Sequence, residues 1–300
     1  MTDTLASLRH KLASAHKLGS VVRAMKAVAA TSIVQYEAAV TALADYARCV
    51  ELGLSLCLQE GPLDGMSAPP PGSVRNRPVG ALIFGSDQGL VGRFNELIAN
   101  FALQALQPLT GPKTVWIVGE RVGTHLEAAN VSIRRRYALP GSVAAITSLV
   151  GEIQLELEAY TAGAPTAAVH VFHNRPVSAA RYEAITERLL PLDYSWRRRL
   201  ARIPWPRARG AEVLGGALTS FPALVHEHLF ICLYKACAES LASENASRLE
   251  AMQRAEKNIE NISASLHRSL NRQRQGTIDA ELFDVVSGFN ALGGGPRSRA

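Results

Sequence analysis

Residues 5 to 57 read LASLRHKLASAHKLGSVVRAMKAVAATSIVQYEAAVTALADYARCVELGLSLC, and this stretch decides the fold. Positions in it recur at alternating spacings of three and four, which places them on one stripe of an α-helix. All of them but Lys26 are apolar or small: Leu5, Leu8, Leu12, Ala15, Gly19, Val22, Lys26, Ala29, Ile33, Tyr36, Val40, Leu43, Ala47, Val50, Leu54 and Cys57. No proline interrupts residues 3 to 59. We therefore expect a helix about 80 Å long at 1.5 Å per residue, which needs a second long helix to cover its stripe.

Small residues on this stripe favour a close approach by the partner helix. They are Ala15, Gly19, Ala29 and Ala47. An alternative stays open, because glycine is a poor helix former: two helices that break near Gly19.

The partner helix is expected near the end of the chain, in residues 222 to 292. No proline follows Pro222 before residue 292, and a sparse apolar stripe runs through polar surroundings. The stripe comprises Leu229, Leu233, Leu241, Leu249, Met252, Ile259, Ile262, Leu266, Leu270, Ile278, Leu282 and Val285. We predict an antiparallel coiled coil of two terminal helices, residues 1–60 and 222–292. A disordered tail at 293–300 should follow.

An α/β domain is expected between the two helices, in residues 79–192. A proline- and glycine-rich linker, residues 61–78, precedes it. Expected strands are 79–84, 114–118, 131–137, 167–172 and 182–190, and expected helices are 95–106, 122–129 and 142–160. This alternation is typical of a Rossmann-like domain with parallel strands. Residues 193–221 should form a basic connecting loop, in which Pro204 and Pro206 exclude regular helix over 196–209.

The composition is that of a globular protein of the cytoplasm. The chain has 300 residues, a formal net charge of +6, 19% charged and 47% hydrophobic residues, which is ordinary for a folded domain. We expect no transmembrane segment, because no apolar stretch reaches roughly 20 residues, and no signal-peptide pattern is present. Cys49, Cys57, Cys232 and Cys237 lack metal or redox spacing, so we expect free, mostly buried thiols, with the first two on the apolar side of their helix.

The first strand is followed by a glycine-rich turn that invites a nucleotide-binding interpretation. Gly85, Gly89 and Gly92 do not have the spacing of a dinucleotide fingerprint, and no P-loop sequence completes them. A tight strand-to-helix turn is therefore favoured, and we expect no bound cofactor.

Two histidine pairs were considered as metal ligands. His170 and His173 should point to opposite faces of a strand, and His226 and His228 do not share a helix face. We therefore expect no metal site, and no motif indicates a catalytic residue.

Charged residues on the two long helices leave two interpretations open. Lys26 is the one charge on the first stripe, so it either fixes register as a tolerated polar residue or meets a third protein where the helices separate. Because a lysine on the stripe costs stability, Lys26→Leu should raise the melting temperature of the isolated coil, and a lower value would mean that Lys26 has a partner within the chain. Arg272, Arg274 and Gln275 are likewise either solvated or in contact with an enclosing partner.

Three segments resemble the gamma subunit of F-type rotary ATP synthases, the central shaft of the catalytic head. RAMKAVAA at 23–30 is similar to the family's K-A-M-x-M-V-A-A, and GSDQGLVGRFN at 85–95 is similar to S-S-D-R-G-L-C-G-x-x-N. LASENASRLEAM at 241–252 is close to L-A-S-E-x-A-A-R-M-x-A-M, and RQGTI follows at 274–278.

The resemblance implies a non-catalytic rotor subunit whose coil inserts into a ring of three alpha and three beta subunits. ATP chemistry would belong to the beta subunits. Arg274 and Gln275 match residues that meet the beta subunits' catch loop, and Met25 with Lys26 match the region facing their lever. The α/β domain would contact the epsilon subunit and the membrane rotor ring, on the cytoplasmic side of the bacterial inner membrane. The ion moved would be a proton or sodium.

Departures from the family pattern indicate a divergent bacterial branch, for which the alternative, N-type class is the candidate. The family's N-T-x-K-I-T is here KLGSVV at 17–22, and its I-T-Q-E is IDAE at 278–281. An acidic, aromatic foot segment of the family is replaced by Arg202, Trp205 and Arg207 with their neighbours, so we expect these residues to make the foot contacts.

Two other functions compete with the rotor shaft. A nucleotide-dependent α/β enzyme would need the phosphate loop that the sequence lacks. A coiled-coil adaptor could bind an acidic partner or nucleic acid through the arginines of 197–209, although an arginine-rich loop is more often a solvated surface. The resemblance favours the shaft and no nucleic acid.

Overall fold

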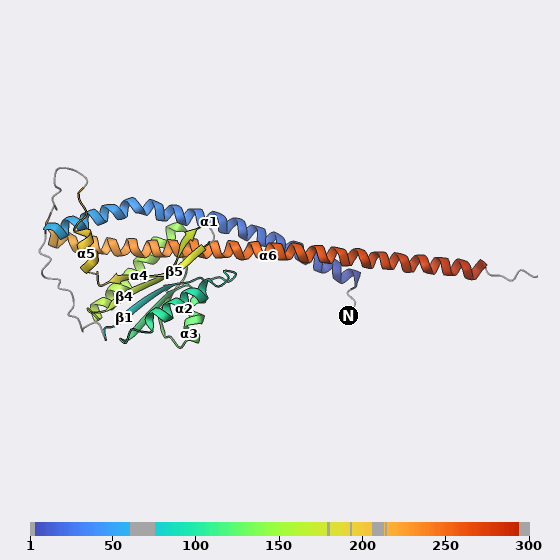
Figure 1. Cartoon of the computed structure of the whole chain (residues 1–300), viewed down its shortest axis with the longest axis horizontal. Coiled ribbons are helices and arrows are strands. Elements are labelled where there is room, and N and C mark those ends of the chain that lie inside the picture. Colours follow the sequence, from blue (N-terminus) through green and yellow to red (C-terminus); the bar gives the residue numbers. More distant parts are fainter. Residues whose placement is uncertain are drawn as a thin grey trace, which may run out of the picture. The chain divides into compact units, whose positions relative to one another are not determined.

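The computed structural model describes residues 4–60, 76–178, 181–192, 194–205, 213 and 215–293. Two long helices occur in this part of the chain: α1 spans Leu5–Glu60 and α6 spans Ala217–Gly293 (Figure 1). Helix α1 continues through Gly19, so the alternative of a break there is wrong. Every predicted stripe position of α1 is buried or half-buried, which confirms the helical periodicity.

The chain divides into two compact units, residues 1–27 with 252–300 and residues 28–251. In the first unit, Lys26 contacts Glu256, and the ring of His16 lies 6.4 Å from that of His267. From the first contact to the second, the residue number falls from 26 to 16 on α1 and rises from 256 to 267 on α6. The two segments are therefore antiparallel.

The two helices are antiparallel in the second unit as well. A Cβ built on Gly53 would lie 3.1 Å from Leu224, and the Tyr46 hydroxyl donates a hydrogen bond to Glu227 at 2.6 Å. Gly53 leaves room for the Leu224 side chain, since any larger residue at position 53 would force Leu224 to shift. The predicted antiparallel pair of terminal helices is therefore confirmed.

The α/β part of the second unit is built on a five-stranded sheet of order β3-β2-β1-β4-β5. Its strands are β1 Val79–Phe84, β2 Lys113–Val118, β3 Ile133–Tyr137, β4 Ala168–Ser178 and β5 Arg181–Leu190. The first four pair in parallel, as predicted, but β5 is antiparallel to β4. The prediction of parallel strands is wrong for β5 because the short connection from β4 leaves no room for the crossover that a parallel pair requires.

Helices cover both faces of the sheet, and Figure 1 shows α2 and α3 on the face opposite α6. Helices α2 (Phe94–Leu106) and α3 (Glu120–Ala128) form one hydrophobic core with alternate residues of β1 and β2. Helix α4 (Val143–Gly163) and the N-terminal half of α6 form the other. Strand β1 is buried at every position, as expected for a central parallel strand.

The connection between the sheet and α6 contains a helix that the sequence analysis excluded. Helix α5 spans Tyr194–Leu200. Its Trp196 and Leu200 pack in a third core with Val50 and Leu54 of α1. A proline disfavours helical backbone only at its own position and at the residue before it. The residues that precede Pro204 by four or more positions can therefore form a helix.

Helix α6 also begins earlier than predicted, at Ala217, so that Pro222 lies inside its second turn. Proline removes one backbone donor there, and the packing of the neighbouring Phe221 and Leu224 against α1 residues stabilises the turn.

By length and composition, one described helix, α1, is apolar enough over 18 residues to cross a membrane. Charged residues interrupt the apolar pattern of α1, so a criterion of an uninterrupted apolar run does not predict a membrane span here. Tyr36, Val50 and Leu54 of the same helix lie in hydrophobic cores shared with α6.

Candidate functional site

The turn between β1 and α2 lies at the carboxyl edge of the parallel strands, where open α/β sheets bind ligands. The Ser86 N–H donates to Asn95 Oδ1 at 2.9 Å, and Asn95 Nδ2 donates back to Ser86 Oγ at 2.8 Å. A Cβ at Gly85 would lie 2.4 Å from that of Val122, so only glycine fits. The Ser86 N–H and the Ser86 and Asn95 side chains therefore bond to each other within the turn.

Asp87, in the same turn, fixes two further segments at this edge. Its Oδ1 accepts the Glu120 backbone N–H at 2.9 Å, and its Oδ2 accepts that of Leu139 at 2.8 Å. A carboxylate in this position is an anion that would repel a phosphate. The turn therefore matches the predicted structural role and not a nucleotide cradle.

Helix α6 is attached to this edge through two buried serines. Ser247 Oγ donates to the Val91 carbonyl at 2.6 Å, and Ser243 Oγ donates to the Asn174 carbonyl at 2.9 Å. Asn174 Nδ2 donates in turn to the Phe94 carbonyl at 3.4 Å. The sequence segments 85–95 and 241–252, which were considered separately, thus contact each other. The signal that could have predicted this is the run of small polar residues that interrupts the apolar stripe of α6.

A buried ion pair lies beside these serines. Arg248 donates to Glu244 at 2.5 Å, and their side chains are 12% and 5% exposed. Burial raises the pKa of Glu244, and Arg248 opposes that shift only in part. We call Asp87, Ser243, Glu244, Ser247 and Arg248 with their partners the α6 junction. It holds the long helix to the sheet by several directional bonds.

The histidines considered as metal ligands have other partners. His173 Nε2 lies 2.8 Å from Glu239 Oε2 in the protein interior, and His226 Nδ1 lies 2.8 Å from Glu158 Oε1 at the surface. Within the described ranges, no group of three or more His, Cys, Asp or Glu is arranged to hold a metal ion.

The four cysteines are free thiols. Cys57 and Cys237 are buried and Cys232 is half-buried, but Cys49 is exposed, so its predicted place on the apolar side of α1 is wrong. It immediately precedes the stripe position Val50 and faces away from it. Burial raises the pKa of Cys232 to about 12, which keeps that thiol protonated and unreactive.

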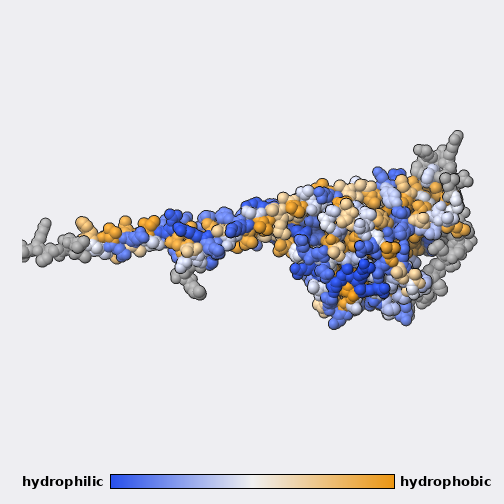
Figure 2. Space-filling model, turned by 180° about the vertical axis from the view of Figure 1, so that it is seen from behind, coloured by the Kyte–Doolittle hydropathy of each residue, from blue (hydrophilic) through white to orange (hydrophobic). Residues whose placement is uncertain are grey.

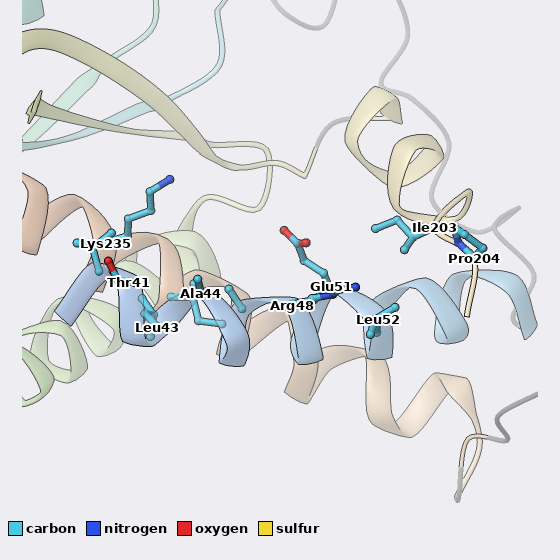
Figure 3. A pocket seen from close by; sticks show the side chains of 12 residues that line it. Thr41, Leu43, Ala44, Arg48, Glu51, Leu52, Ile203, Pro204 and Lys235 are labelled. Carbon is cyan, nitrogen blue, oxygen red and sulfur yellow. The ribbon is translucent and has the colours of Figure 1, made fainter. Parts of the chain in front are cut away.

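Two of the proposed foot residues, Arg202 and Trp205, flank in sequence the residues Ile203 and Pro204, which line a groove in the second unit. Arg202 and Trp205 are exposed, and Arg207 lies outside the described residues. The segment between them is held on α1 because Ser55 Oγ donates to the Ile203 carbonyl at 3.1 Å. Ile203 and Pro204 form one wall of the groove, whose volume is about 840 Å³, and Figure 3 shows α1 opposite them.

The coil residues singled out from the sequence all lie in the first unit. Met25 is half-buried, and Lys26 is half-buried and paired with Glu256. Arg274 and Gln275 are exposed on α6. The geometry leaves the last two accessible to another protein, whereas Lys26 already has a partner within the chain.

Comparison with known proteins tests the resemblance to gamma subunits over nearly the whole chain. A family model described as ATP synthase matches residues 4–292. The chain belongs to this ATP synthase family. The ATP synthase gamma chain of Anaeromyxobacter sp. (strain K) is 27% identical over 96% of this chain and 99% of the relative. That of Methylobacillus flagellatus is 26% identical over 71% and 74%. The resemblance to gamma subunits is therefore confirmed.

Solved structures of ATP synthases share the fold. A chain of the Euglena gracilis mitochondrial ATP synthase, in a structure of OSCP, F1 and c-ring, aligns over 99% of this chain and 97% of its own with a TM-score of 0.64 and 17% identity. A chain of the central stalk and c-ring from Tetrahymena thermophila aligns over 78% and 99%, with a TM-score of 0.55 and 19% identity.

In this ATP synthase family member, the end of α6 carries an exposed apolar surface, so the prediction that Ile278, Leu282 and Val285 belong to the stripe packed on the first helix is wrong. Leu282, Phe283, Val285, Val286 and Phe289 are 50–77% exposed, and hydrophobic atoms appear along this end of the helical unit in Figure 2. The register of the first unit explains it, because α1 begins at Leu5 and leaves the last turns of α6 without a described helical partner. Exposed apolar side chains in such number mark a binding surface. The signal in the sequence was two phenylalanines beyond the end of the paired region.

Proposed function

We propose that this chain is the turning central shaft of an ion-translocating ATP synthase, a non-catalytic subunit that couples ion flow to ATP synthesis or hydrolysis. Its relatives are ATP synthase gamma chains, the central-stalk rotor subunit of F1. The observation that carries the proposal is the family match over residues 4–292, together with two terminal helices that form an antiparallel pair.

The head-facing part of the shaft would be the first unit. Its exposed apolar end would sit inside the ring of three alpha and three beta subunits, which would shield those residues from water. Arg274 and Gln275 would meet the beta subunits, and Met25 with Lys26 would face the moving part of the same subunits. Catalysis would belong to the beta subunits, as the family resemblance implies. Coupling then requires only that the contacts of the shaft differ among the three positions around it.

The α6 junction would let the shaft transmit torque. A rotor that turns the long helix must resist slippage between this helix and the domain attached to the membrane sector. Directional hydrogen bonds from Ser243 and Ser247 and the Glu244–Arg248 pair resist such sliding better than apolar packing alone.

The opposite part would contact the membrane sector. Arg202 and Trp205 are exposed, and we propose them, with Arg207, as contacts to the rotor ring and the epsilon subunit. The complex would be peripheral on the cytoplasmic side of a bacterial inner membrane. Whether the ion is a proton or sodium, and whether the chain belongs to the N-type class, stay predictions.

Co-purification of the tagged chain from its native membranes tests the proposal. We expect one copy with three copies each of two nucleotide-binding subunits, counted by mass spectrometry of the intact complex. Recovery of the chain alone would contradict the shaft. Recovery with nucleic acid, with binding that weakens steeply as salt increases, would instead support the adaptor.

A further inference from the structure

A second cavity lies at the amino edge of the sheet. Its volume is about 410 Å³, and its lining includes Arg77, Val79, Thr110, Gly111, Ala168 and His170. Strands β1 and β4 are parallel and both begin here, so the α6 junction and the glycine turn lie at the other edge. The cavity is therefore separate from the α6 junction and from the glycine-rich turn.

The walls of this cavity are fixed by backbone contacts. The Val79 N–H donates to the Pro112 carbonyl, and the Ala168 N–H donates to the Pro78 carbonyl, both at 2.9 Å. A Cβ at Gly111 would lie 1.8 Å from the Arg77 carbonyl oxygen. The loop after α2 thus packs directly on the backbone of Arg77, and this arrangement requires no rearrangement to form a pocket.

Two basic side chains, Arg77 and His170, line this cavity, and Arg188 lies near them but outside the lining. Arg77 precedes β1, His170 lies on β4, and Arg188 of β5 is its partner in the strand register. Directly opposed residues of antiparallel strands project from the same face. Burial first, and then Arg188 and Arg77, lower the pKa of His170. Burial and Arg188 lower the pKa of Arg77. In the part of the chain that the structure describes, no carboxylate contributes to either shift.

We propose that this cavity binds a phosphate-bearing anion, with Arg77 as its cationic contact and the ring of His170 as a hydrogen-bond donor. An anion beside Arg77 would accept charge-assisted hydrogen bonds from its guanidinium and would favour the protonated form of His170. The volume lies in the range of small-ligand pockets and is larger than a single phosphoryl group needs. The apolar Val79 and Leu109 also line the cavity and could contact the rest of a larger ligand. The source is either free inorganic phosphate or a nucleoside phosphate.

Titration of the full-length chain with inorganic phosphate and with ATP, followed by calorimetry, tests this site. We expect saturable binding that Arg77→Ala weakens at least about tenfold, the usual cost of losing one charge-assisted contact. Arg77→Lys should restore part of it. Arg181→Ala, which removes an exposed arginine from the other end of β5, is the matched control and should bind as the native chain does. Melting temperatures of the variants show whether each one is folded.

The imidazole of His170 gives a second readout. A bound anion favours the protonated ring, so the ratio of the affinity of the native chain to that of His170→Ala should increase as pH falls toward and below the ordinary imidazole pKa of about 6.5, while the titration of the phosphate itself affects both proteins alike. A ratio that stays constant with pH would mean that His170 does not contact the anion. Tighter binding of ATP than of phosphate would identify a nucleotide ligand, and equal binding would identify the phosphoryl group alone. No saturable binding at millimolar ligand, or equal weakening by Arg77→Ala and Arg181→Ala, would overturn the proposal.

Discussion

Lys26 Nζ lies 2.5 Å from Glu256 Oε2, and this bond joins the two helices of the coil across 230 residues of sequence. The lysine side chain is 35% exposed and the glutamate 18%. A charge on the stripe of α1 is therefore matched by an opposite charge on α6. This pair fixes the register of the helices, as single polar stripe positions do in coiled coils.

Lys26→Leu should lower the stability of the chain, which reverses the expectation from the sequence. The substitution leaves the half-buried Glu256 without its partner, at a cost of about 1–2 kcal/mol in the free energy of unfolding. Thermal melting of the purified chain measures it. Lys17→Leu, at an exposed position of the same helix, should change the melting temperature little. A higher melting temperature for Lys26→Leu would contradict the pairing, and Lys26→Leu with Glu256→Leu should recover the loss.

Gly85→Ala should destabilise the second unit, because the new methyl group would lie 2.4 Å from the Val122 Cβ. Overpacking of this kind costs about 1–3 kcal/mol. At Gly141 an added Cβ meets nothing within 4 Å, so Gly141→Ala should change stability by less than about 0.5 kcal/mol. Urea unfolding of both variants measures the difference. Equal stabilities would show that the turn tolerates a side chain.

The sequence predicted the parts of the fold that depend on periodicity. The stripe of α1 follows from spacing alone, and the alternation of strands and helices in 79–163 follows from short apolar runs. It did not predict the direction of β5, which depends on connection length, or α5, whose Trp196 and Leu200 are stabilised by packing against α1. Tertiary contacts of this kind leave no local pattern.

The candidate contacts differ in the same way. Motif similarity drew attention to Lys26 but could not supply Glu256, since pairing across 230 residues depends on the register of the coil. The α6 junction was missed because Ser243 and Ser247 resemble solvated helix residues in sequence. Only the sheet edge against them shows that they are buried.

Arg274→Ala combined with Gln275→Ala should weaken coupling without unfolding the coil. Both residues are exposed on α6, so their removal leaves the helix intact, while the proposed contact with the beta subunits is lost. The measurement is ATP-driven ion pumping per ATP hydrolysed, in the assembled complex. Arg268→Ala, another exposed arginine of the same helix, is the control. If pumping per ATP is unchanged in the double variant, these residues have no part in coupling.

Two glutamates should respond to pH with opposite signs. Burial raises the pKa of Glu244 above its ordinary value near 4.3. For Glu156, burial acts upward, but the bonds donated by Trp116 and Arg134 outweigh it and lower the pKa. Folded protein therefore binds more protons than unfolded protein at Glu244 and fewer at Glu156.

By linkage, the contribution of Glu244 to stability is present below the ordinary carboxyl pKa and decreases as pH rises above it. The contribution of Glu156 is present above the ordinary carboxyl pKa and is lost as pH falls through the lowered pKa of Glu156 in the folded protein. The free energy of unfolding of native chain minus Glu244→Gln should thus decrease from about pH 4 to pH 7. The same difference for Glu156→Gln should increase from about pH 3 to pH 5. Urea unfolding at several pH values measures both. Differences that do not change with pH for either variant would mean that folding shifts neither pKa, and the buried pair of Glu244 with Arg248 could not then act as part of a rigid junction.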